Sequence, residues 1–366
     1  MARSKFRRAP RFENLESRQL LSTGVTSQGP TNDEQLMLQL LNQARTIPAA
    51  AAQEISENIT PDIQATLNYY GVNLQSTLNS IASATPQPPL AWNAQLAQSA
   101  QGHSQDMANN QYQSHTGSDG SSPGTRIQQA GYNNTTSTGE NVYAYSTSVE
   151  EAMEAFLLDW GVSDDGHRMN IQQMGVSAQN AYRDVGVGIV NTSGTSSVGP
   201  MVVTQDFGAQ SNEHAQVVGV AYNDPDNTGF YASGQGVGNV QISAVNLATG
   251  QVSSTQTWAS GGYELSLAPG QYQLIASQNN EVINSSKISV GTVNIEQDYV
   301  LTNTWQGGSL QGAISAAQPS TTPTPAAPVV SVMAVATPQS AQPQASNLAL
   351  SAITWNWTSW SASSSN

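Results

Sequence analysis

The stretch that decides the fold consists of five blocks: QSHTGSDGSSPGTRIQQAGY (113–132), GENV (139–142), DDGHRMNI (164–171), VGVG (185–188) and VTQDFG (203–208). Two histidines and a glutamate stand in these blocks at long spacing: His115, Glu140 and His167. Each lies beside glycine-rich or turn-forming sequence, where backbones approach closely and side chains converge. We therefore predict that the fold brings these three side chains to one site.

The residue types at this predicted site allow three kinds of chemistry. Two imidazoles and a carboxylate bind a divalent cation such as zinc and leave one coordination position open. The same groups also form an acid–base pair, because imidazole titrates near neutral pH. A purely structural polar cluster is the third interpretation. The chain has no G-x-S-x-G, H-E-x-x-H, P-loop or dinucleotide fingerprint, so its catalytic residues, and catalysis itself, stay open.

Composition limits the classes of protein that this chain can be. Its 366 residues allow about two domains. It has no cysteine, which excludes disulfides, cysteine nucleophiles and cysteine-ligated zinc. The net charge is −14, and basic residues are concentrated in residues 1–18. The rest of the chain is therefore strongly acidic, and a protein of that charge repels nucleic acid and anionic lipid. No apolar run reaches the ~18–20 residues of a membrane span.

Two capping patterns place the first helices. Thr31 and Glu34 form a capping box that opens a helix, and Asn93 caps a second one. His103 falls on the apolar face of the second helix. We predict a packed core histidine bonded to a backbone carbonyl, rather than a ligand.

The middle of the chain predicts a loop, a helix and two strands. Residues 112–140 read as a loop with a short helix at 125–130. Arg126 in that helix is a lone cation, predicted to pair with a nearby carboxylate, with a substrate contact as the alternative. Ser148 and Glu151 form another capping box, so Glu151 is most simply a helix cap. Alternation predicts strands over 181–190 and 200–207.

The sequence pattern changes after residue 214. Short alternating runs separated by Gly, Pro and Asn predict a small antiparallel β-sandwich over residues 214–304. Residues 305–366 are dominated by Ala, Ser, Thr, Pro and Gln. Such a segment buries too little apolar area to offset its ordering entropy, so we predict a disordered tail.

The blocks around the three polar residues resemble those of the CAP superfamily in its bacterial, SCP-like form. Together with LLNQART (40–46) and PPLAWNAQLAQSAQGHSQDMA (88–108) they occur in family order. The resemblance covers about residues 31–208 and indicates a domain over 31–210. It implies an α+β fold: a three-layer α–β–α sandwich with a shallow acidic cleft, where some members bind divalent metal. The absence of cysteine departs from eukaryotic members, and the insertion at 47–88 is unlike the compact animal proteins.

Carried over by motif, the cleft histidines are His115 and His167, and the first cleft acid is Glu140. The family's second acid is expected from the helix between GENV and GHR or just after it. The candidates are Glu150, Glu151, Glu154 and Asp164, of which Glu151 is our choice.

Two shorter segments carry further resemblances. YNDPDNTGFYASGQG (222–236) is similar to the calcium loop of SdrD B-like β-sandwiches, which implies Asp224, Asp226 and Thr228 as oxygen ligands. Gln235 stands where that family usually has glutamate, which implies a weaker calcium site, and a plain Asp/Asn turn is the alternative.

FENLESRQLLS (12–22) resembles the LEPR-x-LL segment of planctomycete exported proteins. It indicates a disordered targeting segment over residues 1–30, with a nucleic-acid arm or a plain basic tail as alternatives.

These observations predict a protein that is secreted or held at the cell surface. Its cleft would bind an extracellular ligand (a lipid, a glycan or a protein) and hold a divalent cation such as zinc. The alternative is a metal- or histidine-assisted hydrolase, similar to a protease, that uses the same cleft. A third hypothesis is a structural surface protein. We expect neither a nucleic-acid partner nor a transmembrane span.

Overall fold

The computed structural model describes residues 29–192, 196–211, 213–301 and 307–319. The predicted targeting segment therefore lies almost wholly outside the described residues, as does most of the predicted tail. Within the described ranges, no helix is both long and apolar enough to cross a membrane.

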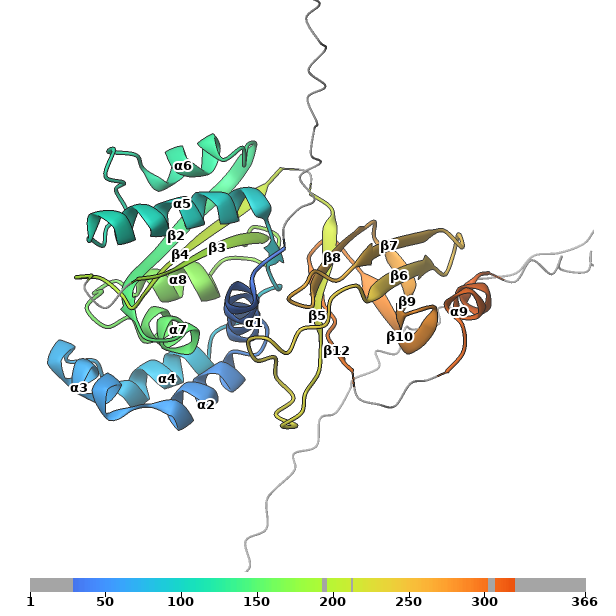
Figure 1. Ribbon diagram of the computed structural model, residues 1–366, viewed down its shortest axis with the longest axis horizontal. Coiled ribbons are helices and arrows are strands. Elements are labelled where there is room, and N and C mark those ends of the chain that lie inside the picture. Colours follow the sequence, from blue (N-terminus) through green and yellow to red (C-terminus); the bar gives the residue numbers. More distant parts are fainter. Residues whose placement is uncertain (1–28, 193–195, 212, 302–306, 320–366) are drawn as a thin grey trace, which may run out of the picture. The chain divides into compact units, whose positions relative to one another are not determined.

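The first domain is a four-stranded sheet between two helical layers (Figure 1). Its strands run in the order β1-β3-β4-β2 and comprise β1 (Ala91–Trp92), β2 (Thr135–Ser146), β3 (Asp184–Asn191) and β4 (Met201–Gln210). Its helices are α1 (Asn32–Thr46), α2 (Pro48–Asn58), α3 (Pro61–Tyr70), α4 (Leu74–Ala82), α5 (Ala94–Asn110), α6 (Pro123–Gln129), α7 (Val149–Leu158) and α8 (Gly166–Gln172). Helices α5 and α6 cover one face of the sheet, and α1, α7 and α8 cover the other. The predicted three-layer α–β–α fold is thus confirmed.

Local capping sets where these helices begin. The Thr31 hydroxyl accepts from the Glu34 amide at 3.3 Å, and the Glu34 carboxylate accepts from the Thr31 amide at 2.8 Å. This capping box starts α1, as predicted. The Asn93 side chain caps α5 and the Ser148 side chain caps α7.

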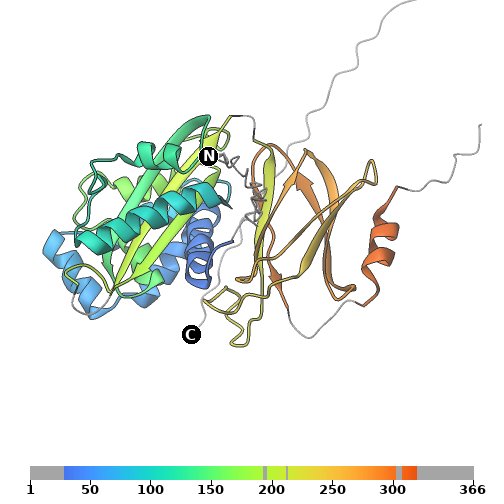
Figure 2. The same ribbon diagram turned by 45° about the horizontal axis from the view of Figure 1, so that its top comes forward.

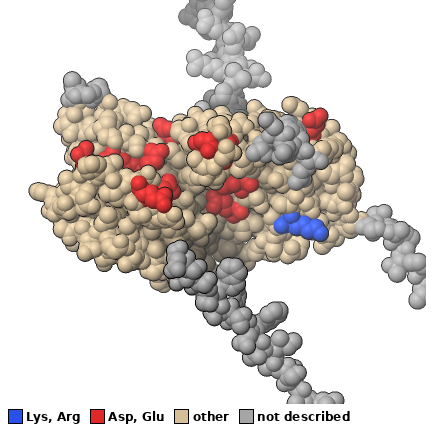
Figure 3. All heavy atoms as spheres, turned by 90° about the horizontal axis from the view of Figure 1, so that it is seen from below, with Lys and Arg blue, Asp and Glu red and all other residues tan. Residues whose placement is uncertain are grey.

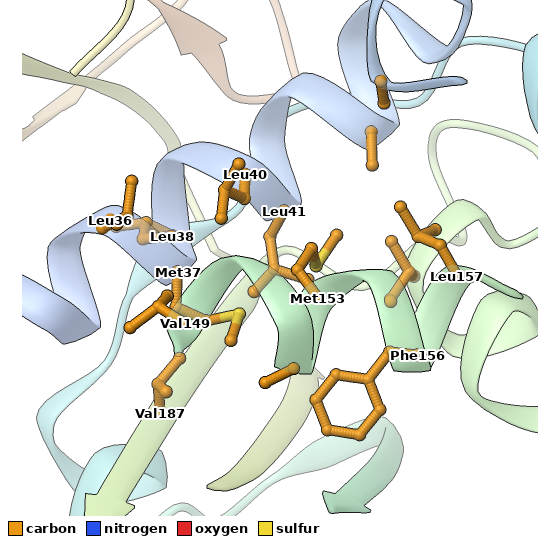
Figure 4. Packing of buried hydrophobic residues seen from close by; sticks show 14 of the residues in the cluster. Leu36, Met37, Leu38, Leu40, Leu41, Val149, Met153, Phe156, Leu157 and Val187 are labelled. Atoms are coloured by element: carbon orange, nitrogen blue, oxygen red, sulfur yellow. The ribbon is translucent and has the colours of Figure 1, made fainter. Parts of the chain in front are cut away.

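The core beneath the sheet joins α1 to α7 (Figure 4). Leu41 and Met37 of α1 are fully buried, and Met153 and Phe156 of α7 pack into the same cluster. This apolar layer fixes α7 against the sheet, and therefore also fixes the segment that follows α7 and leads to His167.

The VGVG block lets α5 lie directly on strand β3. A Cβ atom at Gly186 would stand 1.9 Å from the backbone nitrogen of Ala97, and one at Gly188 would stand 2.2 Å from that of Gln101. Figure 2 shows α5 in front of the sheet. The strand has glycine at alternate positions because the helix backbone occupies the space that side chains would need.

The second domain contains two sheets that share one core. One sheet has the order β10-β9-β6-β7, and the other is built around β5 with β8, β11 and β12. Val217 and Leu265 of one sheet pack in the same cluster as Ile242 and Leu274 of the other. The strands are β5 (Ala215–Tyr222), β6 (Gln241–Asn246), β7 (Val252–Gln256), β8 (Gly262–Leu267), β9 (Gly270–Gln278), β10 (Glu281–Val290), β11 (Ile295–Glu296) and β12 (Tyr299–Val300).

Three predicted elements need correction. The segment before Glu140, predicted as loop, already pairs with β4 as the start of β2 from Thr135. The sandwich is not wholly antiparallel, since β11 and β12 both pair with β5 in parallel. The predicted disordered tail begins with a helix, α9 (Leu310–Ala317), because Leu310, Ala313, Ile314 and Ala317 form one apolar face that packs on the second domain.

We expect Gly186→Ala to destabilise the protein by about 1–3 kcal/mol or more, because the new methyl group forces α5 away from β3. Chemical denaturation measures this change in the free energy of unfolding. Gly102→Ala on α5 is the matched control, since nothing lies within 4 Å of a Cβ atom there. Alanine at this exposed helical position should stabilise by about 0.5–1 kcal/mol. Equal effects of the two substitutions would contradict the close packing described here.

Candidate functional site

The structure places the three predicted polar residues in the wall of one hollow. His115 lies in the loop after α5, Glu140 lies on β2, and His167 lies in the first turn of α8. All three line a hollow of about 470 Å³, which we call the histidine cleft. Its other lining residues are Gln113, Ser114, Val142, Val162, Asp164, Gly166 and Asn170.

The Glu140 carboxylate is buried and fully engaged. Its side chain is 1% exposed. One oxygen, Oε1, lies 2.8 Å from Nδ1 of His115, and the other, Oε2, accepts from Arg126 at 2.5 Å. Arg126 also donates to the His115 carbonyl at 3.0 Å. The predicted pairing of Arg126 with a carboxylate is confirmed, and this pair ties the His115 loop to the sheet.

His167 is held by an acid that sequence reasoning missed. Its Nδ1 lies 2.7 Å from Oδ1 of Asp159, whose side chain is 0% exposed. The second oxygen of Asp159 accepts from the Arg168 amide at 3.0 Å. Asp159 ends α7 in the left-handed conformation, with φ at 57°, which turns the chain back toward His167. An aspartate at the end of a helix, eight residues before the histidine of the GHR block, is the signal that could have indicated it.

Asn141 of the GENV block joins β2 to α8. Its amide donates to the His167 carbonyl at 3.2 Å, and its oxygen accepts from Asn170 at 2.9 Å. The residue next to Glu140 thus fixes the turn that carries His167. This contact explains why blocks that are distant in sequence meet at one cleft.

The hydrogen bonds define the tautomers of three histidines. An ionised carboxylate only accepts hydrogen bonds, so His115 and His167 both carry a proton on Nδ1. In the neutral ring Nε2 then carries the lone pair, and neither Nε2 has a hydrogen bond within the described residues. His103 is the opposite case: it is fully buried, and its Nε2 donates to the Ser114 carbonyl at 2.7 Å. The prediction that His103 is a core histidine bonded to a carbonyl is confirmed.

Asp206 of the VTQDFG block lies beside Glu140, on the neighbouring strand β4. It pairs with Glu140 across β2 and β4, and it is 0% exposed. Neither of its carboxylate oxygens has a hydrogen-bond partner in the described part of the chain. Burial, followed by the nearby charge of Glu140, raises the pKa of Asp206 well above its usual value. The folded protein therefore favours the protonated form of Asp206 more strongly than the unfolded chain does.

The structure places Glu151, our choice for the second cleft acid, outside the lining of the histidine cleft. It accepts from the Thr147 amide at 2.8 Å and from the Thr147 hydroxyl, and it lines a different hollow. Glu150 and Glu154 line that other hollow too, whereas Asp164 lines the histidine cleft. The acid that contacts a cleft histidine is Asp159, at the end of the same helix.

The predicted calcium ligands form a loop closed by its own hydrogen bonds. The Asp224 carboxylate accepts from the Thr228 amide at 3.0 Å and from the Gly229 amide at 2.9 Å. Asp226 lies 3.5 Å from the Thr228 hydroxyl. The Gln235 side chain accepts from the Ala232 amide at 3.0 Å. No group of three or more His, Asp or Glu arranged to hold a metal ion occurs here or elsewhere in the described ranges.

We expect Asp159→Asn to lower the free energy of unfolding by about 1–3 kcal/mol, because the buried bonds to His167 and the Arg168 amide lose their charged acceptor. Urea denaturation of the variant beside the wild type measures the loss. Asp164→Asn, at an exposed position in the same cleft, should stay within about 0.5 kcal/mol of the wild type. An Asp159 variant as stable as the wild type would rule out this role of the Asp159 carboxylate.

Asp206→Asn should change how stability depends on pH. The folded-state pKa of Asp206 is raised, so the folded protein holds its proton more tightly than the unfolded chain does. Its contribution is therefore most favourable at low pH and is lost as pH rises above the ordinary aspartate value of about 3.9. Denaturation at about pH 5 and about pH 8 should show that the variant gains stability relative to the wild type at the higher pH. A difference that does not change with pH would contradict a raised pKa.

Comparisons with known proteins agree with this architecture. Residues 38–207 match the model of the cysteine-rich secretory protein family, CAP, and residues 230–302 match that of the carboxypeptidase regulatory-like domain. The expected SdrD B-like character of the second domain is not confirmed by this match, and the N-terminal resemblance lies in residues that the structure does not describe.

Two solved structures illustrate the similarity. An extracellular protein containing a SCP domain from Bacillus anthracis is 26% identical, with a TM-score of 0.27, over 42% of this chain and 44% of that one. The match thus spans less than half the length of that relative. An outer surface protein from Borrelia burgdorferi is 16% identical, with a TM-score of 0.27, over 41% of this chain and 93% of that one. A search of the curated proteins gives no match. By the family models, residues 38–207 are thus similar to the CAP family, and residues 230–302 are similar to the carboxypeptidase regulatory-like domain.

Proposed function

We propose that this protein acts outside the cell as a binding module, secreted or held at the cell surface, and that the histidine cleft recognises its ligand. The family of the first domain supports an extracellular role. The cleft supports binding because its polar side chains are held in place before any ligand arrives. The observation that carries the proposal is the pair of histidines, each oriented by a buried carboxylate.

A divalent cation such as zinc is the first ligand that this arrangement suits. A histidine that donates its Nδ1 proton to a carboxylate presents Nε2 as a well-oriented and more basic ligand. His115 and His167 both have this arrangement. Glu140 is not the third ligand that the sequence suggested, because Arg126 and His115 occupy both of its oxygens. The two imidazoles would therefore hold the ion together with water or with a group of the bound ligand.

A hydrolase is the second candidate. An imidazole whose Nδ1 is fixed by a buried aspartate is also the usual arrangement of a general base. His167 and Asp159 have this geometry, and the Asp159 side chain is fully buried. Hydrolysis of peptides or esters that disappears in both His167→Ala and Asp159→Asn would favour this candidate over a binding role.

Titration of the untagged protein with Zn²⁺ by calorimetry tests the cation. We expect about one ion per chain, with affinity reduced at least about tenfold in both His115→Ala and His167→Ala, because each variant removes one ligand. His214→Ala removes an exposed histidine outside the cleft and is the matched control. It should bind like the wild type. Equal affinity in all three variants would refute a cation site between the two histidines.

A further inference from the structure

A second hollow in the first domain lies apart from the histidine cleft. It measures about 490 Å³ and shares no lining residue with the cleft. We call it the α2–α7 pocket, because residues of these two helices form most of its wall. Its apolar lining comes from α1, α2, α3 and α7 and comprises Leu40, Ala51, Ile55, Ile63, Met153 and Leu157. Figure 4 shows Leu40, Met153 and Leu157 where α1 faces α7.

Glu154 stands in this pocket without a partner. The residue is 8% exposed and lies among the pocket residues of α7. No hydrogen bond or ion pair reaches its carboxylate from any residue that the structure describes. Burial, followed by the charges of Glu151, Glu150 and Glu54, raises its pKa to about 7. A buried carboxylate facing a hollow, with nothing in the chain to neutralise it, is costly unless a ligand supplies the counter-charge.

The rest of the pocket wall is acidic as well. Glu54, Asp62, Glu150 and Glu151 line it, and none of its lining residues is basic. Arg45 of the neighbouring α1 offers no compensation, because it is buried and donates to the carbonyls of Ile171 at 2.7 Å and Tyr182 at 3.1 Å. On the face of the molecule seen in Figure 3, acidic side chains occur in several places and basic ones in one. Like charges around a low-dielectric wall focus a negative potential into the pocket.

We propose that the α2–α7 pocket binds a small amphiphilic organic cation, an ammonium group on an apolar chain. The apolar chain would be buried against Met153, Leu157 and Ile55, and burial of each methylene contributes about 0.8 kcal/mol. The ammonium donates charge-assisted hydrogen bonds to the Glu154 carboxylate. The pocket volume lies within the ~300–1,000 Å³ typical of small-molecule sites. An anionic amphiphile of equal length meets five carboxylates instead, and a bare metal ion makes no use of the apolar wall.

The probe is decylamine, with decanoate and decanol as ligands of equal chain length, measured by calorimetry with the full chain. At about pH 8 we expect decylamine to bind at least about tenfold more tightly than either, because only decylamine pairs with the carboxylates. Lowering the pH to about 6 protonates Glu154 and should weaken the binding of decylamine but not of decanol.

Glu154→Gln is the decisive variant, since it keeps the shape of the side chain and removes the charge. It should weaken decylamine binding about tenfold, remove the dependence on pH and leave decanol binding unchanged. Glu57→Gln, on α2 but outside the pocket lining, should bind like the wild type. An unchanged thermal unfolding midpoint verifies that each variant is folded. The proposal fails if decylamine does not bind, if it binds no better than decanol, or if Glu154→Gln binds it as the wild type does.

Discussion

The first domain depends on the burial of the Glu140 carboxylate. Removing such a group from water costs several kcal/mol unless charged partners replace the lost hydration. Arg126 supplies the charged partner and His115 adds a hydrogen bond, and both come from the chain between α5 and β2. This long segment is therefore anchored to the sheet at the point where the cleft opens. Asp206 lies beside Glu140 on the neighbouring strand, and its raised pKa reduces the repulsion between the two carboxyl groups.

Each cleft histidine is bonded through Nδ1 to a buried carboxylate, but the two carboxylates come from different elements. His115 relies on Glu140 of the edge strand β2, whereas His167 relies on Asp159 at the end of α7. The position of α7 is set by its apolar packing on α1, so the core beneath the sheet determines where His167 stands (Figure 4). Helix α7 also carries Glu154 into the α2–α7 pocket. One helix thus lines the apolar and acidic pocket, and the aspartate at its end orients His167 in the polar cleft.

Sequence reasoning predicted what local patterns and a family resemblance determine. The capping box at Thr31, the core role of His103 and the strand at VGVG all follow from short-range periodicity and capping chemistry. Asp159 was missed because its contact with His167 depends on a left-handed turn at the helix end, which no periodicity indicates. The parallel pairing of β11 and β12 was missed because alternation predicts a strand and not its partner. Helix α9 was missed because a polar, small-residue composition hid its single apolar face.

Buried carboxylates orient both cleft histidines, so that each neutral ring has its proton on Nδ1 and its lone pair on Nε2. Nitrogen-15 chemical shifts of the imidazole rings, recorded where the rings are neutral, test this claim most directly. We expect the Nδ1–H tautomer for His115 and His167, and the opposite Nε2–H tautomer for His103 in the same spectrum. Nε2–H tautomers at His115 and His167 would contradict the carboxylate contacts. They would also show that the two imidazole rings are not oriented in the cleft as described.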